Sequence, residues 1–222
     1  SCSSSSNEQT FDSSKITRAS EAEVEKVVED FILVEDGGTI EIPAGFFELN
    51  TQLIIDNKTD IIIKGAGMDK TFLSFKGLQT GGEGVKIVGN NILKQDVMIE
   101  NARGDGVKDQ PTDGITFRRI NVTWTNGDKS LKGTYAIYPV QCKNVIIDEV
   151  FASHSRDAVI YVGQSEIIVV KNSMAFATVA GIEIDNSYNT EVFVNIALDH
   201  SGGILILNLP GLRKAHLSLT PF

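Results

Sequence analysis

Short runs of alternating apolar and polar residues recur along this chain at a nearly constant interval. Each run begins with a β-branched aliphatic residue, and subtracting the residue numbers gives intervals of 22, 30, 23, 22 and 22. A period in the low twenties is typical of a solenoid, in which each coil stacks on its neighbours to bury its apolar face. We expect the last four of these aliphatics to be buried and stacked. The aligned residues are Val85, Val107, Ile137, Ile160, Ile182 and Ile204.

The residues within each repeat predict β-strands. Helix-pair repeats need about 33 residues or more, and the leucine and asparagine framework of leucine-rich repeats is missing. Apolar and polar residues instead alternate in β-branched runs, such as 85–88 and 192–194, punctuated by Gly, Asn, Asp and Ser. The sequence therefore predicts an all-β fold, a single-stranded right-handed parallel β-helix whose equivalent residues stack about 4.8 Å apart.

The repeats also predict two polar ladders at one corner of the coils. Amide side chains recur at the same repeat position, and small side chains follow each of the first three. Because equivalent positions stack, we expect the amides to bond one another and Cys142 to be a packed thiol. The amides are Gln141, Gln164, Asn186 and Asn208, and the residues beside them are Cys142, Ser165 and Ser187.

Two segments depart from the repeat. The longest interval is eight residues longer than the usual 22, and the polar run at 128–133 predicts a loop there. Ser20 and Glu23 form a capping-box pattern before apolar residues at helical spacing, which predicts an amphipathic helix over roughly 21–35. A helix at this place would cover the exposed end of the solenoid. Its apolar positions are Val24, Val27, Val28, Phe31 and Ile32.

The helix and the strand at 37–45, Gly-Gly-Thr-Ile-Glu-Ile-Pro-Ala-Gly, resemble the entry cap of the pectin-lyase-like superfamily of β-helices. The repeats resemble a bacterial family of parallel β-helix repeat proteins, related in fold to mannuronan epimerases and to periplasmic copper-maturation β-helices. The resemblance covers about 20–212 and implies the fold, whereas function has to be argued from the residues. The segments that carry it are 113–119, 138–142, 161–165, 202–205 and 208–212.

Composition narrows the partners and the compartment. The net charge is −9, from 20 basic and 29 acidic residues, so nucleic acid is not an expected partner. The start, Ser1-Cys2 followed by serines, is typical of a bacterial lipoprotein junction, and a chance cysteine in a disordered leader is the alternative. A lipid on Cys2 would be the sole membrane attachment, on the periplasmic or surface side of the cell envelope. We divide the chain into a flexible leader (1–19), a β-helix domain (20–211) and an atypical or truncated tail (212–222).

The residue after each buried aliphatic should point outward, because side chains alternate along a strand. This row mixes lysines, tyrosines and a glutamate, unlike a generic solvated face. Tyrosine rings suit sugar rings, and lysines suit acidic sugar substituents. The row is Lys86, Lys108, Tyr138, Tyr161, Glu183 and Leu205. We expect substrate to bind at Lys86, Lys108, Tyr138, Tyr161 and Asp185.

Catalysis would use the same face and the corner before it. Uronan cleavage or epimerisation, the chemistry that the resemblance suggests, needs a neutralised carboxylate and groups that remove and donate a proton. The candidate catalytic residues are Tyr161, His154, Arg156 and Glu183. Asp105 and Asp157 fit turn caps as well as chemistry. No Asp-Pro-His-Asp signature is present, and neither a metal, calcium included, nor another cofactor is indicated.

Three hypotheses remain open at this point. The leading one is a lipid-anchored envelope protein whose β-helix face engages a polysaccharide. The second is a structural scaffold that docks another envelope protein, and the third is a uronan lyase or epimerase.

Overall fold

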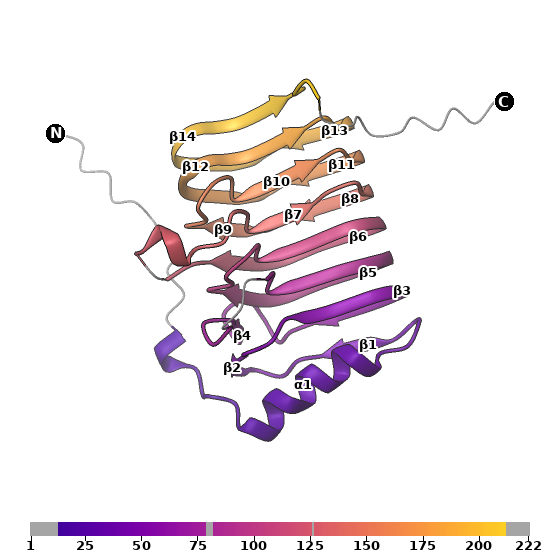
Figure 1. The fold of residues 1–222 in the computed structure, drawn as a ribbon, viewed down its shortest axis with the longest axis vertical. Helices are drawn as coiled ribbons and strands as arrows, with labels where there is room; N and C mark the ends of the chain where they lie inside the picture. Colours follow the sequence, from indigo (N-terminus) through magenta and orange to yellow (C-terminus); the bar gives the residue numbers. More distant parts are fainter. Residues whose placement is uncertain (1–12, 79–81, 126, 212–222) are drawn as a thin grey trace.

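The computed structural model describes residues 13–78, 82–125 and 127–211, which form a parallel β-solenoid with one N-terminal helix, α1 (Figure 1). The main path of the sheet runs β1-β3-β5-β6-β7-β10-β12-β14, so each coil is bonded to the coil before and after it. The elements are η1 (Ser13–Lys15), α1 (Glu21–Leu33), β1 (Thr39–Glu41), β2 (Gly45–Glu48), β3 (Leu53–Lys64), β4 (Thr71–Ser74), β5 (Val85–Glu100), β6 (Val107–Thr123), η2 (Lys129–Leu131), β7 (Ile137–Pro139), β8 (Lys143–Asp148), β9 (Phe151–Ser153), β10 (Ile160–Gly163), β11 (Glu166–Lys171), β12 (Met174–Asp185), β13 (Tyr188–Phe193) and β14 (Ile196–Leu207).

The predicted register of the repeats is confirmed. Parallel pairing connects the six aligned aliphatics from Val85 to Ile204, and Leu53 of β3 extends the same row by one coil. The side chains from Leu53 to Ile182 are buried in the solenoid interior. The expectation of burial is wrong for Ile204, which is 45% exposed. Ile204 lies on β14, and no later described strand covers the far side of that coil.

A buried ion pair lies inside the largely apolar interior of the solenoid. Lys94 takes an inward position between Ile63 and Phe117 in its row, and its Nζ lies 2.7 Å from Oδ1 of Asp109. The two side chains are 3% and 0% exposed. The ammonium also lies 4.1 Å from the centre of the Phe117 ring, a cation–π contact. Burial lowers the pKa of Lys94 and raises that of Asp109, against their mutual attraction.

The helix α1 lies across the first coils and contacts β1, β2 and β3 (Figure 1). The predicted capping box is present, since the Ser20 side chain accepts a hydrogen bond from Glu23 N while the Glu23 carboxylate accepts one from Ser20 N. The helix ends at Leu33, two residues before the predicted end. Its buried side chains are Val27 and Phe31, whereas Ile32, another of the apolar positions, is 69% exposed.

Outside the repeat, the structure contains the loop that the sequence predicted at 128–133. The eight-residue excess forms a loop containing the 3₁₀ turn η2, which Asp128 caps. Arg18 and Ala19 pair with Phe46 of β2, so order begins before residue 20. Residues 1–12 of the expected leader, with Cys2, and the tail at 212–222 lie outside the described residues. None of the described helices is long and apolar enough to cross a membrane.

The corner ladders are confirmed in part. Gln141 accepts a hydrogen bond from Gln110 at 3.1 Å and donates one to Gln164 at 3.4 Å, but Asn186 bonds the backbone of Leu209 instead. Beside them, the Ser165 hydroxyl accepts from Cys142 N, and the Ser187 hydroxyl accepts from Ser165 N. Cys142 is a buried free thiol whose pKa burial raises to about 12. These bonds pin neighbouring coils in register.

Candidate functional site

The outward row predicted from the sequence exists as one strip across the coils. Strand pairing places Lys86 beside Lys108 and Lys108 beside Tyr138. Tyr161 and Glu183 are likewise partners on β10 and β12, and Leu205 follows on β14. Ile54 of β3 precedes Lys86 in the row. Because the register is set by the buried aliphatics, the alternation of side chains was sufficient to predict this strip.

Three tyrosines form the centre of the strip, and we call them the tyrosine cluster: Tyr135, Tyr138 and Tyr161. The centre of the Tyr135 ring lies 4.7 Å from the centre of the Tyr138 ring and 4.6 Å from that of the Tyr161 ring. The ring centres of Tyr138 and Tyr161 are 5.3 Å apart. All three side chains are partly exposed. The sequence pattern missed Tyr135 because it lies in the turn before β7, outside the repeated strand positions. The proximity of a third tyrosine to Tyr138 in the chain is the one signal that pointed to it.

The Tyr161 ring is held in place by its neighbours on β10 and β12. Its hydroxyl donates a hydrogen bond of 2.8 Å to Oδ2 of Asp185. The ring lies across Gly163, where a Cβ atom would approach Tyr161 Cε1 to 2.7 Å. Glycine at 163 therefore permits the close approach. Burial and the Asp185 carboxylate raise the pKa of Tyr161, so the phenol keeps its proton at neutral pH.

Asp185 itself is fully buried in this arrangement. Its second oxygen, Oδ1, has no hydrogen-bond partner among the described residues. We expected this carboxylate to bind substrate directly. In the structure, its Oδ2 accepts the hydrogen bond of the Tyr161 hydroxyl.

Lys108, at the lysine end of the strip, contacts other residues of the protein. Lys108 Nζ lies 3.5 Å from Oε1 of Glu83 and 5.1 Å from the centre of the Tyr138 ring. Gln52 donates a second bond to the same glutamate. Burial opposes ionisation of Glu83, but its hydrogen bonds and the charges of Lys108 and Lys86 outweigh burial and lower its pKa. The Lys108 ammonium is therefore already partnered.

Carboxylates surround the tyrosine cluster. Asp105 Oδ1 accepts a hydrogen bond of 3.1 Å from Tyr135 N. Asp105 therefore caps a turn of the next coil, which is one of the two roles that the sequence suggested for it. Burial raises the pKa of Asp105 to about 6. Burial also raises the pKa of Glu183, with further contributions from Asp157 and Asp185. The raised pKa values of these two carboxyl groups therefore reflect their burial beside the cluster first and neighbouring carboxylates second.

The predicted catalytic residues do not all contact one another in the structure. Arg156 donates a hydrogen bond of 2.8 Å to the Thr134 hydroxyl, and its charge acts on Asp105, at the edge of the tyrosine cluster. His154 follows β9, and its ring contact is with Phe176, at 5.8 Å between centres. The ring contacts of Tyr161 are with the other two tyrosines. In the described part of the chain, no group of three or more His, Cys, Asp or Glu side chains is placed to hold a metal ion.

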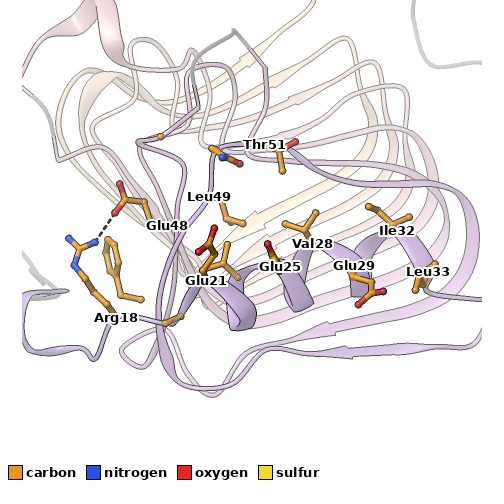
Figure 2. Close-up of a pocket in the computed structure, with 15 residues that line it drawn as sticks. Arg18, Glu21, Glu25, Val28, Glu29, Ile32, Leu33, Glu48, Leu49 and Thr51 are labelled. Carbon is orange, nitrogen blue, oxygen red and sulfur yellow. Dashed lines mark hydrogen bonds and ion pairs between the residues drawn. The ribbon is translucent and has the colours of Figure 1, made fainter.

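A separate groove of about 1020 Å³ runs along α1, and Figure 2 shows its lining. Val24, Val28 and Leu49 are among its apolar lining, and Ile32 is exposed beside them. Glutamates from successive turns of α1 line it as well. None of the strip residues contributes to this groove, so it is a second surface of different chemistry.

Comparison with solved structures identifies the fold. The A-module of the mannuronan C-5 epimerase AlgE4 from Azotobacter vinelandii superposes with a TM-score of 0.63 and 18% sequence identity, over 80% of this chain and 58% of that one. The AlgE6 A-module from the same organism superposes with a TM-score of 0.55 and 16% identity, over 82% and 62%. No protein-family model and no curated protein sequence matches the chain. The chain spans about three fifths of each module and is a parallel β-solenoid similar in structure to these epimerase modules.

Proposed function

We propose that this protein binds a polysaccharide on the strip formed by the outward residues of β6, β7, β10 and β12. The observation that carries the proposal is the tyrosine cluster, three partly exposed rings with centres 4.6 to 5.3 Å apart. Such rings offer the apolar faces on which sugar C–H groups stack, with polar groups at the edge for sugar hydroxyls. The shared fold with epimerase modules is consistent with a long, flat glycan lying along the coils.

The chemistry of the strip supports binding over proton transfer. A uronan lyase or epimerase would need a base beside the sugar. The Tyr161 hydroxyl donates a hydrogen bond to Asp185, and its raised pKa keeps the phenol protonated at neutral pH, so the phenolate that could act as the base is scarce. Asp105, with a pKa of about 6, is the better candidate for proton exchange, but it already accepts a bond from Tyr135 N. We therefore place the enzyme hypothesis behind the binding hypothesis.

Changing Tyr138 and Tyr161 together to alanine should weaken glycan binding about tenfold or more, because both stacking faces are lost. Binding to an oligosaccharide panel by calorimetry measures this. Tyr188→Ala is the matched control, since Tyr188 is a partly exposed tyrosine on β13, outside the cluster. The double variant should keep its β-rich circular dichroism. Unchanged affinity in the folded double variant would rule out the tyrosine cluster as the binding platform.

Cys2 lipidation would place this strip in the bacterial cell envelope. It remains a prediction from the sequence, and the intact mass of the full-length protein made in bacteria would reveal it.

The groove along α1 favours a second function, the docking of a protein partner. Glu21, Glu25 and Glu29 occupy successive turns of one helix face, and none has a hydrogen bond or ion pair to a described residue. Ile32 and Leu33, at the C-terminal end of this helix, are 69% and 61% exposed. An apolar groove with unpaired carboxylates along it complements a basic amphipathic segment. We propose such a segment of a partner protein as its occupant.

A synthetic amphipathic peptide with lysines along one edge should bind this groove, and the same peptide with glutamates in their place should bind at least about tenfold more weakly. Fluorescence anisotropy at low salt measures both. Changing Glu21, Glu25 and Glu29 to glutamine should remove the preference, whereas Glu191→Gln on β13 should leave it unchanged. Equal binding of the two peptides would contradict the charge complementarity on which this docking function rests.

A further inference from the structure

We propose that the tyrosine cluster accepts saccharide units without a carboxylate, namely neutral hexoses and amino sugars, and discriminates against uronates. This inference rests on the proposed glycan-binding function and specifies its substrate class. It departs from the substrate named for the structurally similar epimerase modules, because it follows from the charges around this cluster.

Most of the charged side chains around the tyrosine cluster are acidic, and Lys108 is the cation that contacts one of its rings. Glu183 is the direct partner of Tyr161 on the adjacent strand, so its outward side chain lies about one strand spacing away. Asp105 bonds the backbone of Tyr135, and Asp157 N donates a hydrogen bond to the carbonyl of Thr134, the residue before Tyr135. Asp185 lies against the Tyr161 hydroxyl. A uronate ring stacked on these tyrosines would bring its carboxylate among these acidic groups.

The cations of the strip do not compensate for this charge. Lys108 is engaged by Glu83 and by the Tyr138 ring. Arg156 is bonded to Thr134 and acts on Asp105. Lys86 lies two strands from Tyr138 in the row, about 9.6 Å at the usual strand spacing, and its charge acts on Glu83. A carboxylate on the cluster would therefore meet four acidic side chains, those of Asp105, Asp157, Glu183 and Asp185, against two nearby cations, of which Lys108 is already paired with Glu83.

The same acidic groups suit hydroxyl and ammonium groups. A carboxylate accepts hydrogen bonds from sugar hydroxyls, and it pairs with an ammonium through a charge-assisted bond. Glu183 and Asp157 are only partly buried, so a bound ligand can reach them. Affinity should therefore rise from uronate to neutral hexose to amino sugar.

Three β-1,4-linked tetrasaccharides test this order: mannuronate, mannose and glucosamine oligomers, titrated into the protein at pH 7 and low salt. The mannose oligomer should bind at least about tenfold more tightly than the mannuronate oligomer, and the glucosamine oligomer at least as tightly as the mannose one. Added salt of about 0.5 M should narrow the differences, since they arise from charge.

The variant Asp157→Asn/Glu183→Gln should bring the ratio of mannose to mannuronate affinity close to one. Glu191→Gln, an exposed glutamate on β13, should leave that ratio unchanged. Tightest binding of mannuronate to the unaltered protein would overturn this inference while leaving glycan binding intact. Binding of none of the three oligomers would instead refute the proposed function together with it.

Discussion

Replacing Lys94 by methionine should lower the free energy of unfolding by about 3–5 kcal/mol, because it leaves the Asp109 carboxylate buried without its cation. The two groups are 2.7 Å apart and 3% and 0% exposed, so water cannot take the place of the ammonium. Asp109 Oδ2 already has no hydrogen-bond partner among the described residues. Equilibrium unfolding in urea at pH 7, followed by circular dichroism, measures the change.

The double variant Lys94→Met/Asp109→Leu provides the control. It removes both charges and keeps apolar volume inside the coil, so its stability should return to that of the unaltered protein or exceed it. Recovery in the double variant identifies the unpaired charge, and not the lost side-chain volume, as the cause. A single Lys94→Met variant as stable as the unaltered protein would contradict the buried ion pair.

Replacing Ile160 by alanine should cost about 2–5 kcal/mol, the usual range for removing a buried aliphatic side chain. Ile160 is 0% exposed and lies between Ile137 and Ile182 in the buried row. The cavity would face both neighbouring coils, which the hydrogen-bonded ladders keep from collapsing around it.

Ile206→Ala is the matched control for this prediction. The same side chain is 71% exposed at position 206, so its loss should change stability by no more than about 0.5 kcal/mol. Both variants lose an isoleucine from a strand, so the difference between their urea midpoints measures the effect of burial without the intrinsic preference of isoleucine for strands. Equal effects would mean that the register derived from the repeats does not describe the packed interior.

Much of the fold was predictable because the solenoid repeats local chemistry. The spacing of Ile137, Ile160 and Ile182 is a property of the chain itself, and a stacked coil must place such residues above one another. The same logic predicted the capping box of α1 and the part of the corner ladder from Gln141 to Gln164. Side-chain alternation then determined which residues form the outward strip.

The candidate site was predictable only as far as this register reaches. The strip residues Tyr138, Tyr161 and Glu183 follow from alternation, because one register assigns every strand position to a face. Tyr135 does not, because it lies in a turn whose path depends on the neighbouring coils. His154 was grouped with Tyr161 by its corner position, but its ring packs against Phe176.

The sequence by itself thus determined the repeat, its register and which strand residues face outward, because these depend on local spacing. Only the tertiary structure decided how side chains pair across coils. It placed Asp109 opposite Lys94, engaged Lys108 with Glu83 and covered Asp185 with the Tyr161 ring. These contacts depend on side-chain conformations and on residues 15 to 25 positions apart, which hydrophobic periodicity does not encode.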